Sequence, residues 1–300
     1  MNNAKNASAH VGKCALCDTE NIELKESHSI PKFVYKWVKE SSKTGFIRGG
    51  DNVNDRLQDG PKEHLLCNDC EGKLSAIEKV FAKGVFKIIA NYRSQANSIT
   101  VTEEMRVAVI SIFWRALLTT RHRDNDRTIE DNILFDSFMS SLKHQINAKQ
   151  CLSKIYFAPF IADSSYYDLP PEMIYNLERS VGGQDIRFYD NPHRFFSLFK
   201  VPFIYFYIFS EGWDNEEMKN STPFDVGSIN LTSIKQIPDT LRELILREHD
   251  HFEEMKKSLS QENLDKIIKS AEKNKNITGS DNSRTRMIDA IKNNLKRDGS

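Results

Sequence analysis

The chain has 300 residues, of which 28% are charged and 39% are hydrophobic, and its formal net charge at pH 7 is zero. This composition excludes an intrinsically disordered chain, because the apolar residues suffice for a packed core. It also excludes a protein that attracts nucleic acid through a strong overall positive charge, so any nucleic-acid binding would depend on local basic patches.

Two pairs of cysteines in the pattern Cys-x-x-Cys open and close the first part of the chain. Cys14 and Cys17 form the first pair, and Cys67 and Cys70 form the second. Four thiolates in two such pairs can surround one tetrahedral zinc ion, so the sequence predicts a structural zinc site. Disulfides are the weaker alternative, because they need an oxidising compartment and the N-terminus lacks the apolar segment of a secretory signal. Cys151 stands apart, and we expect it in the core.

Between the two cysteine pairs, the sequence predicts a strand, a helix and a loop. The strand leads into residues 26–28, and the helix begins at Pro31, because proline suits the first turn of a helix. Residues 41–63 are rich in glycine, asparagine and aspartate and should form a loop or hairpin. After the second pair, apolar residues at helical spacing over residues 74–88 predict an amphipathic helix.

Two more helices are expected next. One covers residues 103–121, and the other begins at Thr128, where Asp131 can complete a capping box. The first contains the longest apolar run, residues 107–118. This run is shorter than the about 20 residues that span a bilayer, so we expect a buried helix and a soluble, cytoplasmic protein.

The rest of the chain mixes strands and helices. Pro159 favours an edge position for its strand, and helices should begin at Pro170 and at Pro238. A polar segment over residues 274–283 precedes a last amphipathic helix surrounded by basic residues. Strands are predicted at residues 155–161, 186–189, 203–209 and 229–231.

These elements predict an α+β fold in three parts. Residues 1–98 form a zinc-stapled unit, residues 99–275 form a larger, mostly helical α+β accessory region, and residues 276–300 form a polar linker with a basic amphipathic tail. We expect the accessory region to select a target, sense a signal or build an oligomer.

The order of motifs over residues 12–90 resembles the four-cysteine branch of the HNH, or ββα-metal, endonucleases. The segment from His28 to Pro31 is similar to the family's acid-His-Ile-x-Pro strand, and Leu66 to Cys70 is similar to the Leu-Cys-x-x-Cys segment that enters its helix. The resemblance implies a zinc-stapled, treble-clef-like ββα unit that hydrolyses phosphodiester bonds in DNA, with RNA not excluded. It further implies a prokaryotic restriction or anti-phage setting, with a homo-oligomer or a defence-system protein as partner.

The resemblance also assigns roles to particular residues. His28 would be the general base that activates water. Glu71 stands where the family commonly has a ligating histidine, and a carboxylate there suits a catalytic Mg²⁺ or Mn²⁺ ion. Glu26 is a second candidate ligand for this ion. Gln58 could hold the histidine by a hydrogen bond through its amide.

The chain departs from the family pattern at two positions. Ser27 stands where the family usually has an acidic ligand, and Glu26 could replace it only with the help of a strand bulge. Lys62 falls near the position of the family's asparagine and cannot act as that amide. Gln58 is our candidate for its role, and Asn52 and Asn54 are rivals.

The sequence leaves a different class of function open. Local basic residues, which are Lys36, Arg48, Arg56 and Lys62, could contact nucleic acid or simply form a solvated surface. The alternative to a nuclease is therefore a non-catalytic, zinc-containing module that binds nucleic acid or another protein.

Overall fold

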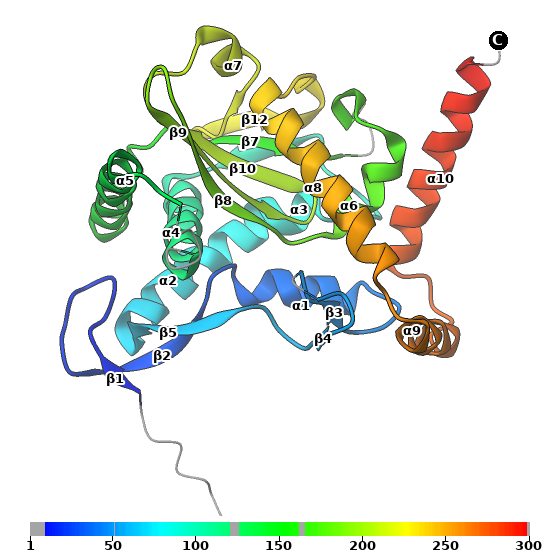
Figure 1. Ribbon diagram of the computed structural model, residues 1–300, viewed down its shortest axis with the longest axis horizontal. Helices are drawn as coiled ribbons and strands as arrows, with labels where there is room; N and C mark the ends of the chain where they lie inside the picture. The colour runs from blue at the N-terminus through cyan, green and yellow to red at the C-terminus, as the bar shows by residue number, and fades with distance from the viewer. Residues whose placement is uncertain (1–9, 51, 121–125, 162–165, 299–300) are drawn as a thin grey trace, which may run out of the picture.

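The computed structural model describes residues 10–50, 52–120, 126–161 and 166–298 and confirms the α+β class. In Figure 1, a small N-terminal sheet lies along one side of the molecule and a larger sheet lies on the other, with helices α2 (Asn68–Phe81) and α4 (Glu103–Thr120) packed together between them. Within these ranges, none of the helices combines the length and the apolar character that a bilayer crossing requires.

The N-terminal unit has a ββα arrangement. Its antiparallel sheet has the order β1-β2-β5, and α2 follows β5 without a loop. Leu24 pairs with Cys67 and His28 with Lys62, and a bulge lies between Lys25 and Glu26. The strands are β1 (Val11–Gly12), β2 (Ile22–His28) and β5 (Lys62–Cys67).

The predicted helix and hairpin lie between β2 and β5. Pro31 directly precedes α1 (Lys32–Glu40), as its fixed backbone angle favours. A short antiparallel hairpin follows, formed by β3 (Ile47–Arg48) and β4 (Arg56–Leu57). Both elements are inserted into the ββα unit rather than added at its end.

After α2, the helical path continues through a π-helical segment (Ala82–Phe86) into α3 (Lys87–Ile89). The next strand, β6 (Ser98–Val101), pairs with the distant β12 (Gly227–Asn230) and was not predicted, because only its four residues alternate, with Ile99 and Val101 buried, at the end of a polar segment. Helix α4 is almost completely buried, which explains the apolar run within it. Helix α5 (Ile129–Ala148) begins with the predicted capping box, in which Thr128 and Asp131 bond reciprocally.

The larger sheet is antiparallel and has the order β11-β7-β10-β9-β8. The predicted aromatic strand is its central strand, β10, whereas β9 was not predicted. The edge position expected from Pro159 is wrong, because β7 lies between β11 and β10. The proline is tolerated because β11 pairs only with the first two residues of β7, so its missing N–H costs no ladder bond on that side. The strands are β7 (Tyr156–Pro159), β8 (Gly182–Tyr189), β9 (Arg194–Val201), β10 (Ile204–Phe209) and β11 (Thr222–Pro223).

Helices cover both faces of this sheet. On one face, Phe206 packs against Phe81 of α2, with ring centroids 5.7 Å apart. On the other face, the hydroxyl of Tyr205 donates to Glu248 of α8 (Asp239–Lys257) at 2.7 Å. One continuous apolar core therefore contains residues from both sides of the boundary predicted between residues 98 and 99. The N-terminal unit and the rest of the chain share this core.

Short and C-terminal helices complete the molecule. Arg286 of the last helix forms an ion pair at 3.0 Å with the fully buried Glu178. This helix begins within the segment expected to be a linker, because the Thr278 N–H and hydroxyl both bond to Asp281. The remaining helices are η2 (Tyr166–Asp168), η3 (Pro171–Met173), α6 (Ile174–Arg179), α7 (Asn215–Lys219), η4 (Leu231–Ser233), α9 (Gln261–Lys273) and α10 (Gly279–Asp298).

A buried lysine links β9 to the end of α6. The Lys200 ammonium donates to the carbonyls of Asn176, Leu177 and Ser180 at 3.2, 3.0 and 2.8 Å. These bonds add to those that the end of α6 already has, since the Asn176 carbonyl also accepts from the Ser180 N–H and the Leu177 carbonyl from the Phe203 N–H. Burial lowers the pKa of Lys200 to about 7, although the carboxylates of Glu248 and Glu178 oppose this shift.

The lowered pKa of Lys200 predicts a pH-dependent stability. Between the folded pKa of about 7 and the unfolded value near 10, the unfolded chain binds more protons. The free energy of unfolding should therefore rise with pH in this window, by at most about 1.4 kcal/mol per pH unit. Below it, both states are protonated and the dependence disappears. Urea unfolding across the window should give a shallower rise in Lys200→Met, and equal slopes in the two proteins would contradict the prediction.

Candidate zinc centre and histidine site

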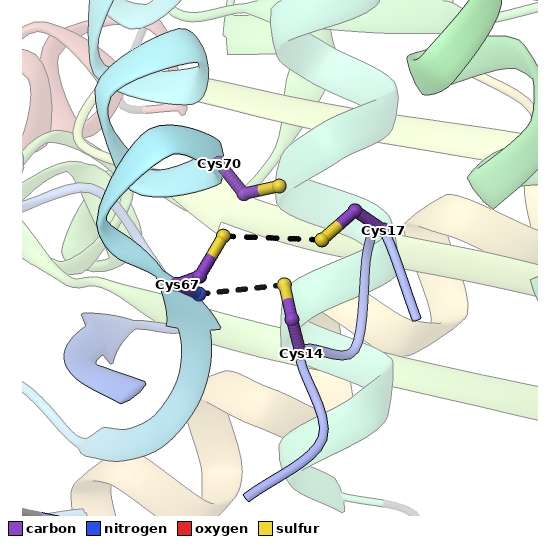
Figure 2. Close-up of side chains that lie close together, drawn as sticks. All are labelled: Cys14, Cys17, Cys67 and Cys70. Carbon is purple, nitrogen blue, oxygen red and sulfur yellow. Dashed lines mark hydrogen bonds between the residues drawn. The ribbon is translucent and has the colours of Figure 1, made fainter. Parts of the chain in front are cut away.

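Four cysteine side chains converge where β5 passes into α2. Their sulfurs all lie within 4.8 Å of one another, and Figure 2 shows them pointing toward a common centre. Cys14 and Cys17 come from the loop after β1, Cys67 ends β5, and Cys70 lies in the first turn of α2. All four are free thiols. The predicted cysteine cluster is therefore present.

The geometry of this cluster fits a tetrahedral zinc ion. Zn–S bonds of about 2.3 Å place the sulfurs about 3.8 Å apart, and the Cys17 and Cys67 sulfurs lie 3.8 Å apart. The Cys67 main-chain N–H also donates to the Cys14 sulfur at 3.3 Å, which would stabilise a thiolate. Hydrogen bonds with Thr19 lower the pKa of Cys17 to about 6, so this thiol ionises readily.

The cysteine loop also contacts the second half of the chain. Asp18, which adopts a left-handed conformation with φ of 60°, accepts from Lys143 of α5 at 2.7 and 2.8 Å. Asn147 of the same helix donates to the carbonyl of Leu16 at 3.2 Å. The cluster is thus held between the small sheet, α2 and α5.

His28 is the last residue of β2, and its side chain is only 11% exposed. Its Nε2 lies 3.0 Å from Oδ2 of Asp59. Among the described residues, Nε2 is shielded from solvent and has no hydrogen-bond partner, so the contact is a close approach of the ring to the carboxylate. Asp59 was not among the predicted site residues, although it follows Gln58 directly.

Asp59 belongs to a chain of charged contacts on this side of the sheet. Its Oδ2 lies 3.2 Å from the Lys62 ammonium, which lies 3.6 Å from Oε2 of Glu26. Partial burial disfavours the charged form of Asp59, but the contacts with His28, the Gly60 N–H and Lys62 outweigh it and lower the pKa of this carboxyl. Asp59 is therefore an anion beside the imidazole.

Gly60 fixes the path of the loop that carries Asp59. A Cβ at this position would lie 2.0 Å from Cζ of Tyr35, which no side chain can tolerate. The Gly60 N–H donates to Oδ1 of Asp59 at 3.0 Å. The close approach of the backbone to the buried Tyr35 ring thus holds Asp59 against His28.

Glu71 approaches β2 from the other side. Its Oε2 accepts a hydrogen bond from the hydroxyl of the fully buried Ser27 at 2.7 Å. Because successive strand residues point to opposite faces, Ser27 faces α2 while His28 faces Asp59. In the described part of the chain, the four cysteines form the one group of three or more ligand side chains close enough to share an ion. His28, Glu26 and Glu71 do not form a second such group.

The remaining predicted residues are distributed around the insertion between β2 and β5. The side chain of Gln58 is exposed, and its main-chain carbonyl accepts from Lys39. Lys36 lies 3.6 Å from Glu40, and Arg48 pairs with Arg56 across the hairpin.

A cavity of about 400 Å³ has Asp59 and Glu40 in its wall, and His28 is connected to it only through Asp59, because His28 is not among the lining residues. Its basic residues are Lys32, Lys36 and Lys39, which share one face of α1. Only Lys36 was a predicted nucleic-acid contact. The spacing of the three lysines was visible in the sequence, but Asp59 became recognisable only when the loop path was known.

A search of family models, curated proteins and solved structures found no match to this chain.

The cysteine geometry predicts one bound zinc ion per chain. Because structural zinc sites contribute about 10–16 kcal/mol of apparent binding energy, chelation or Cys70→Ala should unfold the N-terminal unit. Metal analysis and circular dichroism of the purified protein test this expectation. Cys151→Ala is the matched control, because Cys151 is buried outside the cluster, and it should retain the zinc. A metal-free chain that melts identically with and without chelator would refute the zinc centre.

The approach of Gly60 to Tyr35 makes a second prediction. Gly60→Ala should destabilise the protein by about 1–3 kcal/mol, because a methyl group is forced into a packed ring. Gly72→Ala is the control, since a Cβ on that exposed turn of α2 meets no atom within 4 Å, and it should be neutral or stabilising by up to about 1 kcal/mol. Chemical denaturation measures both, and equal stability of the two variants would contradict the prediction.

Proposed function

We propose that the protein is a metal-dependent endonuclease that hydrolyses phosphodiester bonds in DNA. The observation that carries this proposal is the contact of His28 with Asp59 at 3.0 Å, because Asp59 also lines a cavity that three lysines of α1 share. A histidine close to a carboxylate anion is suited to accept a proton, because the carboxylate stabilises the imidazolium that forms, and lysines suit a phosphate. The resemblance of residues 12–90 to HNH endonucleases agrees with this chemistry.

In the proposed reaction, His28 removes a proton from a water molecule. The water oxygen forms a bond to phosphorus, the bond from phosphorus to the leaving oxygen breaks, and the proton remains on the imidazole. Asp59 stabilises the imidazolium that forms, because its carboxylate lies close to the ring. Lys32 and Lys39 neutralise the phosphate from the cavity wall.

Glu71 is the candidate ligand for a catalytic divalent ion. One of its oxygens accepts from Ser27, and the other is available. Mg²⁺ commonly binds one or two carboxylates and retains several waters or phosphate oxygens, so a single carboxylate near β2 is compatible with it. Because Glu71 lies on the α2 side of β2 and His28 on the Asp59 side, Glu71 alone does not place an ion at the phosphate that His28 would serve. A catalytic ion there would be held mainly by waters and phosphate oxygens and would supply charge neutralisation at the phosphate and the leaving oxygen. Glu26 is a less suitable ligand, because Lys62 already lies 3.6 Å from its carboxylate.

The test is cleavage of supercoiled plasmid by the full-length protein with Mg²⁺ or Mn²⁺. His28→Ala should lower the cleavage rate at least about 100-fold, the contribution typical of a general base. His144→Ala is the matched control, since His144 is exposed on α5, and it should cleave like the wild type. In Asp59→Asn, the loss of the carboxylate should also lower the rate, because the imidazolium is no longer stabilised.

Three outcomes separate the proposed function from its alternatives. Equal cleavage by wild type and His28→Ala would exclude His28 as the base. Binding of DNA without cleavage would identify a non-catalytic nucleic-acid-binding module, and absence of both activities would leave a zinc-containing protein-interaction module. RNA offered in place of plasmid reveals whether the substrate preference is for DNA.

A further inference from the structure

The β3–β4 hairpin presents two arginines on one face. Arg48 and Arg56 are direct cross-strand partners, and Phe46 precedes Arg48 by two residues, which places it on the same face. The guanidinium carbons lie 5.1 Å and 4.7 Å from the centre of the Phe46 ring. Phe46 therefore supports both cations through its ring.

The positive charge on this face is not neutralised within the described part of the chain. None of the ion pairs there includes Arg48 or Arg56, although Lys36 and Lys62 are both paired with carboxylates. Like charges directly opposite one another destabilise a strand pair, and burial followed by the charge of Arg56 lowers the pKa of Arg48. A bound anion would remove this repulsion.

The two arginines have different surroundings. Arg48 donates to the carbonyls of Val53 and Asn54 at 3.0 and 3.1 Å. Its Nε and Nη2 are shielded from solvent and have no hydrogen-bond partner among the residues that the structure describes. Arg56 is exposed. Arg48 thus supplies positive charge from within the hairpin, while Arg56 can offer its donors to a ligand.

The hairpin is fixed to the C-terminal helices. The Asn54 amide donates to the carbonyl of Ser258 at 3.1 Å and accepts from the Ser260 N–H at 2.9 Å. These serines lie in the turn between α8 and α9, and Figure 1 shows the hairpin between α1 and α9. Because the hairpin is held in place before a ligand arrives, binding costs less conformational entropy.

We propose that Arg56, supported by Arg48 and Phe46, binds a phosphate of the nucleic-acid backbone outside the lysine-lined cavity. This inference rests on the proposed function and adds a second contact point for the same substrate. The recognised chemistry is a phosphodiester anion, and the guanidinium fork is suited to it.

The test measures binding of a short fluorescein-labelled DNA duplex to the full-length His28→Ala protein, which should not cleave the probe. Arg56→Gln in this background should weaken binding about tenfold at moderate salt. It should also reduce the slope of log K against log salt by about one, as loss of one phosphate contact does. Arg56→Lys should retain the slope, because it keeps the charge. Arg247→Gln is the matched control, since Arg247 is exposed on α8, and it should bind like the parent.

An unchanged affinity and slope in Arg56→Gln would overturn this inference, as would an equal loss in Arg247→Gln. Failure of the parent protein to bind the duplex would overturn it as well. Binding that depends on Arg56 in a wild-type protein that never cuts DNA would support the hairpin site while the proposed nuclease fails. The two proposals are therefore separable.

Discussion

The convergence of four thiols at the junction of β5 and α2 is the constraint on which the N-terminal unit depends. Cys67 ends the strand and Cys70 lies in the first helical turn, so one ion bound there would fix the angle between the two elements. His28 pairs with Lys62 at the far end of the same two-strand ladder. Glu71 follows Cys70 directly in the chain. The positions of the imidazole and the helix carboxylate therefore both derive from this single attachment.

The second constraint is the shared apolar core. Phe81 of α2 packs against Phe206 in the middle of the larger sheet, and Phe113 of α4 packs on Phe199 with ring centroids 4.6 Å apart. Helix α2 thus has two roles, since its first turn carries Cys70 of the cysteine cluster and its last turn fills the main core. Because α2 contacts both the larger sheet and the cysteine cluster, a change in the packing of the sheet would be transmitted to the cluster through this one helix.

Features that depend on local pattern were predictable from the sequence. The cysteine pairs, the capping box of Thr128 and Asp131, and the buried helix over residues 107–118 all appear as expected. Strand β9 was not predicted, because the polar Lys200 interrupts its apolar pattern and is accommodated only by the carbonyls at the end of α6. Strand β6 was not predicted because its alternating pattern covers only four residues, and its partner is the distant β12.

The candidate site was predictable only in part, for a related reason. His28, Glu71 and the four cysteines follow recognisable motifs, and their roles as catalyst and catalytic ligand stay predictions. Asp59 lies in a loop without a motif, and its contact with His28 depends on Gly60 passing against Tyr35. Tertiary packing decides which residue of an irregular loop meets the end of a strand. Such a contact cannot be predicted from the spacing of residues along the chain.

The anchoring of Asn54 to the turn between α8 and α9 has a consequence for dissecting the molecule. A fragment ending near residue 98 would contain all four cysteines and both strands of the ββα unit, yet it would remove Ser258 and Ser260 from the Asn54 amide. It would also expose Phe81 by removing Phe206. The fragment would be a four-cysteine peptide whose arginine hairpin is no longer held by the C-terminal helices. Its binding properties would therefore differ from those of the intact chain.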